Sequence, residues 1–207
     1  KKKMKDNPIH MAIINLSSDS FSEPGVNTTE GIILQVKQAI SFGADIIDIG
    51  AQSTKPGSEQ IEEIIEQRKI GEAISILRAI EAGADIINDI SGGKDTDMKQ
   101  VLKEYKDALY ILTHSLGLFS TMHDSYMYKD MFEELRRYYE ESLIKLSLSS
   151  SRVIFDIGIG FSKNYNQNIE ALESARRIKL AIRSPVLVGV SRKGFIGKII
   201  HESDPKA

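Results

Sequence analysis

Cysteine is absent from this chain of 207 residues. Without it the protein has no disulfide and no thiolate metal site, which fits a cytosolic protein. The longest apolar runs have only about five residues, whereas a membrane-spanning helix needs about 20. No secretory signal peptide is visible either. We therefore expect a cytoplasmic protein that does not associate with membranes.

A strong charge of either sign is also lacking. The net charge is −2 and the sequence pI about 6.1, and the basic start Lys1–Lys3 is too short for an arm, so no nucleic-acid partner is expected. The chain contains no Walker loop, Rossmann fingerprint, nucleophile elbow or kinase signature. Its histidines do not have the spacing of zinc ligands. At 23.1 kDa we expect one domain over residues 1–207.

The sequence does contain short apolar runs that alternate with amphipathic stretches. The runs are continuous and rich in Ile and Val, as is typical of strands buried on both faces of a parallel sheet. Strands are predicted at Met11–Leu16, Asp45–Ile49, Asp85–Ile90, Leu109–Thr113, Val153–Phe155 and Val186–Val190. Helices are predicted at Thr29–Phe42, Ile61–Ala82, Thr96–Lys106, Met131–Leu148 and Gln167–Ile182. This alternation indicates an α/β fold with right-handed crossovers.

Two helices end in nearly the same phrase, Phe42–Asp48 and Ala82–Asn88, in which glycine caps the helix before a strand begins. Such repetition favours a (β/α)8 TIM barrel over an open sheet. In barrels the active site lies at the carboxyl ends of the strands. Polar residues gather at those ends: Asn15, Asp19, Asp48, Gln52, Asn88, Asp89, His114, Asp156, Ser191, Arg192 and Lys193.

The most informative segment is Asp156–Phe161, in which an acid ends a buried strand and two glycines then turn the chain. A carboxylate there is partly desolvated and held on a rigid element, and a ligand can lie against bare backbone. This arrangement suits a flat, hydrogen-bonding heterocycle. The alternative is an ordinary strand-to-loop turn with a capping aspartate.

Other loops allow two interpretations each. Asn15–Phe21 offers an oxygen ligand for a hard cation or phosphate, or a capping loop. Ser53–Gly57 can hold an anion or form a surface turn. A buried Asn88 can bind the amide edge of a ring or a neighbouring strand end. Ser191–Gly194 places two cations beside a predicted helix start, which suits an anionic ligand more than a solvated turn. A lone histidine such as His114 is more often a structural group than a ligand.

Taken in order, these motifs resemble the dihydropteroate synthase family of pterin-binding enzymes, from about His10 to Ile200. The resemblance implies a transferase of folate biosynthesis that joins 6-hydroxymethyl-7,8-dihydropterin diphosphate to 4-aminobenzoate and releases diphosphate. It also implies Mg²⁺ as cofactor, a homodimer, and a target of sulfonamides. Whether a pyrophosphokinase domain precedes Lys1 stays open.

The resemblance also implies roles for residues of this chain. Asn88, Asp156 and Lys193 would hold the pterin, and Asn15 would meet magnesium and diphosphate. Thr54 would contact the diphosphate-bearing substrate. Phe161, Lys193 and Ser191 would border the aminobenzoate pocket, over which the loops with Asp19 and Lys55 would close. Three neighbours complete the predicted substrate-binding set: Ser53, Gly160 and Arg192.

The chain departs from the family pattern in two ways. Ser17-Ser18 replaces Thr-Pro, and Lys55, Ile157 and Thr113 replace Arg, Pro and Met. More importantly, the third and eighth strands are missing. We predict a chain break near Leu77, where the expected helix runs straight on. The missing elements favour an alternative, a non-catalytic pterin-binding relative. Another alternative is a methyltetrahydrofolate–corrinoid methyltransferase, against which the first and last motifs argue.

Overall fold

The computed structural model describes residues 8–15, 29–50, 84–94, 98–116, 126–191, 193 and 196. The chain divides into two compact units, Lys1–Glu59 and Gln60–Ala207. Within the described residues each strand pairs in parallel with a strand that neighbours it along the chain. None of the described helices is both long and apolar enough to cross a membrane.

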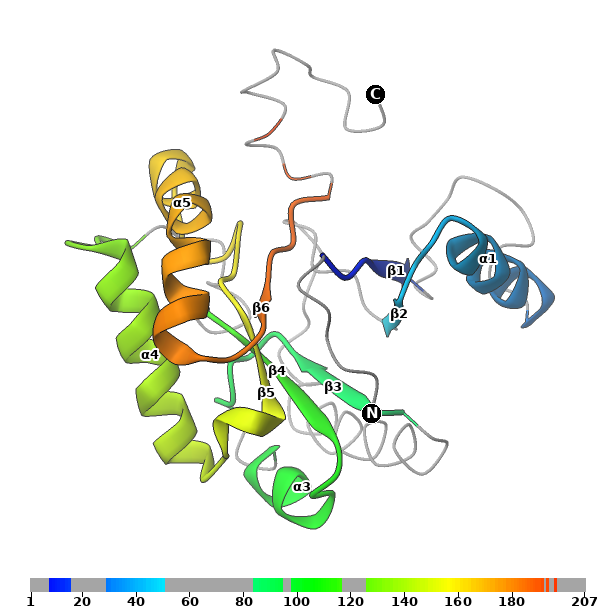
Figure 1. The fold of residues 1–207 in the computed structure, drawn as a ribbon, viewed down its shortest axis with the longest axis horizontal. Helices are drawn as coiled ribbons and strands as arrows, with labels where there is room; N and C mark the ends of the chain where they lie inside the picture. Colours follow the sequence, from blue (N-terminus) through cyan, green and yellow to red (C-terminus); the bar gives the residue numbers. More distant parts are fainter. Residues whose placement is uncertain are drawn as a thin grey trace, which may run out of the picture. The chain divides into compact units, whose positions relative to one another are not determined.

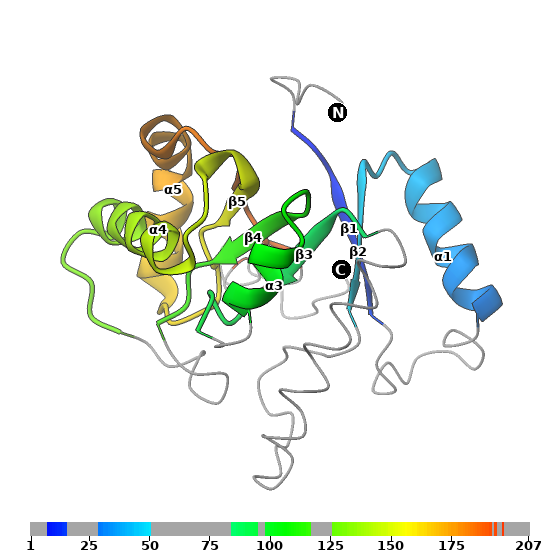
Figure 2. The same ribbon diagram turned by 90° about the horizontal axis from the view of Figure 1, so that it is seen from below.

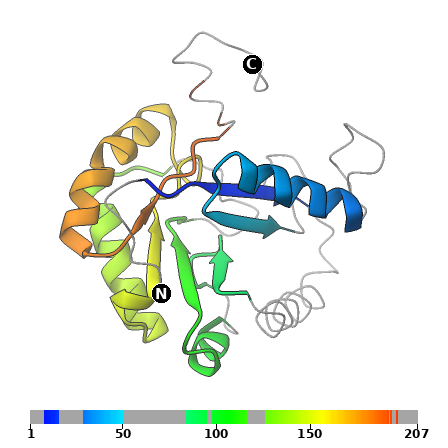
Figure 3. The same ribbon diagram turned by 45° about the vertical axis from the view of Figure 1, so that its right-hand side comes forward.

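The first unit contains one β-α-β element (Figure 3). Strand β1 (Met11–Asn15) pairs with β2 (Ile46–Gly50), and helix α1 (Thr29–Ser41) connects them. Gly43 ends the helix in the left-handed region, with φ +89°, and its N–H donates to the Ile40 carbonyl at 3.0 Å. This is the glycine cap predicted from the repeated phrase.

The second unit contains a four-stranded sheet in the order β3-β4-β5-β6 (Figure 1). Its strands are β3 (Ile86–Asp89), β4 (Leu109–Thr113), β5 (Val153–Asp156) and β6 (Val186–Leu187). Its helices are α3 (Met98–Glu104), α4 (Met131–Leu146) and α5 (Tyr165–Ile182), with a 3-10 turn, η3, at Ser150–Arg152.

The two faces of this sheet differ in what covers them. Alternate residues share a face, and those of one face pack with the helices into the core. This face carries Ile87, Tyr110, Leu112, Val153 and Phe155. Figures 1 and 2 show α4 and α5 side by side along it, and the Tyr139 ring lies 5.3 Å from the Phe155 ring. The opposite face carries Asn88, Ile111, Thr113, Ile154 and Asp156.

The start of α5 is fixed by a capping box that the helical periodicity did not predict. The Asn164 side chain accepts from the Gln167 N–H at 3.0 Å, and the Gln167 side chain accepts from the Asn164 N–H at 2.7 Å. The helix therefore begins at Tyr165, two residues before its predicted start. Asn168, one turn in, accepts from the Gly160 N–H at 2.6 Å and so ties the preceding loop to the helix.

The other elements follow the predicted pattern with small differences. Leu109–Thr113 is a strand over its full predicted length, whereas β6 ends at Leu187, not Val190. It ends there because β5 turns away: the last ladder bond runs from the Ile157 N–H to the Leu187 carbonyl. The predicted helix Ile61–Ala82, and with it the predicted break near Leu77, lies outside the described residues.

Arg152 ties the end of α3 to the start of β5, and its loss should destabilise the second unit. Its guanidinium donates to the carbonyls of Leu102, Tyr105 and Ala108 at 2.7–3.2 Å. Because a hydrogen bond with a charged partner contributes about 1.5–3 kcal/mol, Arg152→Met should lower the free energy of unfolding by at least that amount. Urea titration measures it, with the exposed Arg176→Met as control. Equal losses in the two variants would contradict the prediction.

Candidate active site

The loop between β5 and α5 carries the acid predicted to recognise a ligand. Asp156 is the last residue of β5, is half-buried, and accepts from the Gly158 N–H at 2.9 Å. Gly158 and Gly160 both have positive φ, +65° and +82°. The predicted glycine turn after a strand-ending acid is therefore confirmed.

Each of these glycines allows a close approach. A Cβ atom on Gly158 would lie 2.0 Å from the His114 carbonyl oxygen, so no side chain fits there. A Cβ atom on Gly160 would lie 3.2 Å from Lys193 Nζ and 3.3 Å from its Cδ. The bare backbone thus lets β5 turn beside the segment after β4 and lets Lys193 lie across the loop.

Lys193 and Phe161 meet beside this turn. Lys193 Nζ lies 4.8 Å from the centroid of the Phe161 ring, within the range of a cation–π interaction. Burial lowers the pKa of Lys193, and the charge of Asp156 opposes that shift. The structure therefore gathers three predicted residues, Asp156, Phe161 and Lys193, with the half-buried Gly160 between the last two.

Burial and nearby charges act on Asp156 in opposite directions. Burial raises the pKa of the carboxyl above its usual value of 3.8. The Gly158 N–H opposes this most, followed by the charges of Lys163 and Lys193. The site thus contains a desolvated carboxylate that needs nearby cations or hydrogen-bond donors to stay ionised.

Asn88 lies on the same face of the sheet as Asp156 but is not buried as predicted. Its register partner in β4 is Ile111, whereas Thr113 is paired with Asp156, so Asn88 lies two residues nearer the amino ends of the strands. It is exposed, whereas its register partner Ile111 on the same face is buried; in the described sheet Asn88 lies on the outermost strand, β3, and Ile111 on an inner one. The buried polar residue is instead Asp89, which accepts from the N–H groups of Ser91 and Gly93 at 2.8 and 2.9 Å.

The remaining predicted residues are only partly described. Asn15 ends β1 opposite Gly50, and Ser191 is exposed. The other predicted positions, Asp19, Ser53, Thr54, Lys55 and Arg192, lie outside the described residues.

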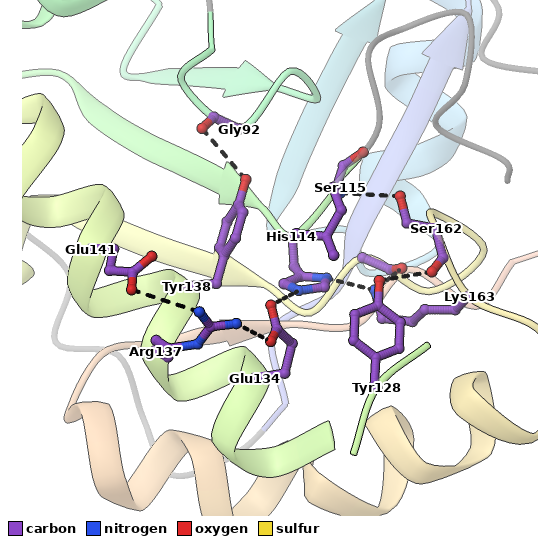
Figure 4. Close-up of polar contacts among 12 residues, drawn as sticks. Gly92, His114, Ser115, Tyr128, Glu134, Arg137, Tyr138, Glu141, Ser162 and Lys163 are labelled. Atoms are coloured by element: carbon purple, nitrogen blue, oxygen red, sulfur yellow. Dashed lines mark hydrogen bonds and ion pairs between the residues drawn. The ribbon is translucent and has the colours of Figure 1, made fainter. Parts of the chain in front are cut away.

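A buried polar cluster behind the loop was not predicted as a site (Figure 4). Lys163 Nζ lies 2.7 Å from His114 Nδ1, and His114 Nε2 lies 3.8 Å from a carboxylate oxygen of Glu134. His114 is fully buried, and its Nε2 has no hydrogen-bond partner. Glu134 also pairs with Arg137. In the sequence, His114 is marked only by its position directly after an apolar run. Lys163 is a single lysine in a predicted loop, and no pattern marks it.

His114 should make the protein sensitive to acid. Burial, and then the charge of Lys163, lower its pKa to about 4, from 6.5 in the unfolded chain. The unfolded state therefore binds more protons between these values, and stability falls as the pH drops from 6.5 to 4, by roughly 3 kcal/mol in all. His114→Asn, which keeps an acceptor for Lys163, should flatten this dependence in urea titrations at each pH. The exposed His10→Asn should not.

Comparison with known proteins shows which family this chain resembles. A family model described as pterin binding enzyme matches residues 11–207. Dihydropteroate synthase of Synechocystis sp. is 36% identical over 220 residues, covering 95% of this chain and 75% of the relative. The mitochondrial folate synthesis bifunctional protein of Pisum sativum is 37% identical over 227 residues, covering 91% of this chain and 44% of the relative. Dihydropteroate synthase of Xanthomonas albilineans, solved with 4-aminobenzoic acid, has a TM-score of 0.81 and 27% identity, covering 97% of this chain and 79% of that one.

The matches also bear on the prediction that the barrel is incomplete. Both sequence matches extend over more positions than the 207 residues of this chain, so the relatives contain internal segments without a counterpart here. That is consistent with an incomplete barrel. The structural matches confirm the (β/α)8 fold class predicted from the sequence. From the family match and these relatives, the chain belongs to the pterin-binding enzymes, among the dihydropteroate synthases.

Proposed function

We propose that this chain condenses 6-hydroxymethyl-7,8-dihydropterin diphosphate with 4-aminobenzoate to give 7,8-dihydropteroate and diphosphate. The observation that carries the proposal is the desolvated carboxylate of Asp156, which lies beside a bare glycine turn and near the cation of Lys193. This combination suits a flat ring whose N–H groups donate to a carboxylate. Asn88 lies on the same face of the sheet as Asp156, and its side-chain amide would bind the same edge of the ring.

The reaction asks little proton transfer of the protein. The neutral arylamine is already nucleophilic, and its nitrogen attacks the pterin methylene as the bond to the diphosphate oxygen breaks; the proton that the nitrogen then loses passes to diphosphate or water. Positive charge develops on the methylene and negative charge on the departing diphosphate, so pre-positioned charges provide the main stabilisation. Holding the two substrates in line supplies much of the rest. Phe161 and Lys193 border the position proposed for the arylamine, with Ser191 following β6.

Mg²⁺ is part of the proposal through Asn15. Mg²⁺ in phosphate chemistry takes only one or two protein oxygens and is otherwise held by phosphates and water. An amide oxygen at the carboxyl end of β1 has the right chemistry for one such ligand, together with a diphosphate. The bound ion would offset the negative charge that diphosphate gains. On the family resemblance we also propose that the protein is cytoplasmic and forms a homodimer. Each chain would form a single domain.

A second candidate is a pterin-binding protein without synthase activity, favoured by the segments that the relatives have and this chain lacks. Diphosphate release, measured with both substrates and with each alone, separates the candidates. We expect release that requires 4-aminobenzoate. Pterin binding without release would establish the second candidate. Methyl transfer from methyltetrahydrofolate to a corrinoid would point to the methyltransferase alternative.

Lys193 should matter for substrate use and not for folding. The residue lies in a loop, and its Nζ faces the Phe161 ring. Lys193→Ala should lower kcat/KM at least tenfold, because a charged hydrogen bond contributes about 1.5–3 kcal/mol. The exposed Lys179→Ala on α5 is the control. A large drop in melting temperature in Lys193→Ala alone would instead indicate a structural role.

A further inference from the structure

The ammonium group of Lys163 contacts the loop that bounds the proposed pterin site, and Figure 4 shows its contact with His114. Lys163 immediately precedes the cap of α5, yet its side chain is buried, with an exposed fraction of 5%. Nζ lies 2.7 Å from His114 Nδ1 and donates to the carbonyls of Gly158 and Phe161, both at 3.0 Å. An ammonium has three N–H donors, and here three acceptors surround it. The charged form therefore matches the site, and His114 completes it as a neutral acceptor.

The two carbonyls belong to residues whose other atoms form the site. The Gly158 N–H donates to Asp156, and the Phe161 ring receives Lys193. Lys163 thus holds both ends of the turn from Gly158 to Phe161. It cannot be a catalytic group, because its side chain is buried behind that turn.

Charged groups on several elements act on Lys163. Asp156 on β5 and Glu134 on α4 favour the ammonium, whereas Lys193 and burial oppose it, and burial is the largest effect. Together they lower the pKa of Lys163 to about 7. Lys163 in turn holds down the pKa of Asp156, more strongly than Lys193 does.

On these contacts, and on the proposed function, we propose that Lys163 is a positioning residue for pterin recognition. Its ammonium fixes the Gly158–Phe161 turn through three contacts and keeps Asp156 ionised from behind, so that the carboxylate can accept from the ring. His114 serves this arrangement as an acceptor and does not touch substrate.

The test is the pH profile of binding of 6-hydroxymethylpterin, measured by calorimetry. In the wild type, affinity should fall at low pH as Asp156 is protonated, and should fall again above about pH 7 as Lys163 loses its proton. Lys163→Met should bind about tenfold more weakly at pH 7. Its acid midpoint should move to higher pH, because the cation that lowers the pKa of Asp156 is gone. The exposed Lys179→Met should match the wild type.

The absence of cysteine allows a rescue experiment. Lys163→Cys introduces a unique thiol, and treating the unfolded protein with 2-bromoethylamine restores an ammonium on a side chain of equal length, with sulfur in place of Cγ. The refolded aminoethylated protein should regain affinity. Its less basic amine should shift the alkaline fall to lower pH, which a merely structural role would not do. If Lys163→Met does not fold, this shift alone tests whether Lys163 is a positioning residue.

Two results would overturn the proposal without touching the proposed function. One is a folded Lys163→Met protein with the wild-type affinity and acid midpoint. The other is an aminoethylated protein with an unshifted alkaline limb. If the wild type itself binds no pterin at any pH, the proposed function fails, and the role of Lys163 fails with it.

Discussion

Asp156→Asn should weaken pterin binding at least tenfold while leaving the protein as stable as the wild type or more so. The loss follows because the variant replaces an acceptor-only group by one that also carries donors, and a charged hydrogen bond contributes about 1.5–3 kcal/mol. The gain in stability follows from the sign of the pKa shift. Burial raises the pKa of Asp156, so its ionisation at neutral pH opposes folding, and the neutral amide removes that opposition.

Calorimetry with a pterin measures the first effect and thermal unfolding the second. The variant keeps an oxygen that can accept from the Gly158 N–H, so the turn should persist. Asp107→Asn makes the same change of charge on an exposed loop just before β4, and should leave binding unchanged. Unchanged pterin affinity in Asp156→Asn would refute the proposed role of this carboxylate.

Gly158→Ala should cause the largest loss of stability of any single methyl group added to this loop. The new Cβ would lie 2.0 Å from the backbone oxygen of His114, which cannot move as a side chain would. Overpacking of this kind costs about 1–3 kcal/mol, and a side chain at positive φ adds about 1–2 kcal/mol. We therefore expect the free energy of unfolding to fall by about 2–5 kcal/mol and pterin binding to be lost.

Gly160→Ala separates the clash from the backbone strain. This glycine also has positive φ, but the added Cβ would meet the end of the flexible Lys193 side chain at 3.2 Å. It should lose only the strain, about 1–2 kcal/mol, as urea titration of both variants can show. If the two variants lose equal stability, the contact with the His114 carbonyl does not restrict position 158.

The acid of the proposed site was predictable because a strand end and a glycine turn are local patterns. Asp156 follows a run of residues that favour strands, and Gly158 and Gly160 come after it. The residue types and their spacing therefore predicted an acid at the end of a strand, before a turn. Lys163 could not be predicted in this way. Its partner His114 is 49 residues away in sequence, and only the parallel pairing of β4 with β5 brings the two together.

The exposure of Asn88 was mispredicted for a related reason. An apolar strand predicts burial, but it does not show whether the strand lies inside its sheet or at an edge. Asn88 lies on β3, the outermost strand of the described four-stranded sheet, whereas its register partner Ile111 lies on the inner strand β4 and is buried. The length of β6 likewise depended on its neighbour, since Val186 and Leu187 pair only as far as β5 continues.

The order of the strands has a consequence for how the protein is made. In the second unit each strand after β3 pairs with the one just before it, so a new strand meets a partner that the ribosome has already released. Synthesis proceeds at about 5–20 residues per second, which is slow compared with helix formation. The sheet can therefore grow one β-α unit at a time from its β3 edge.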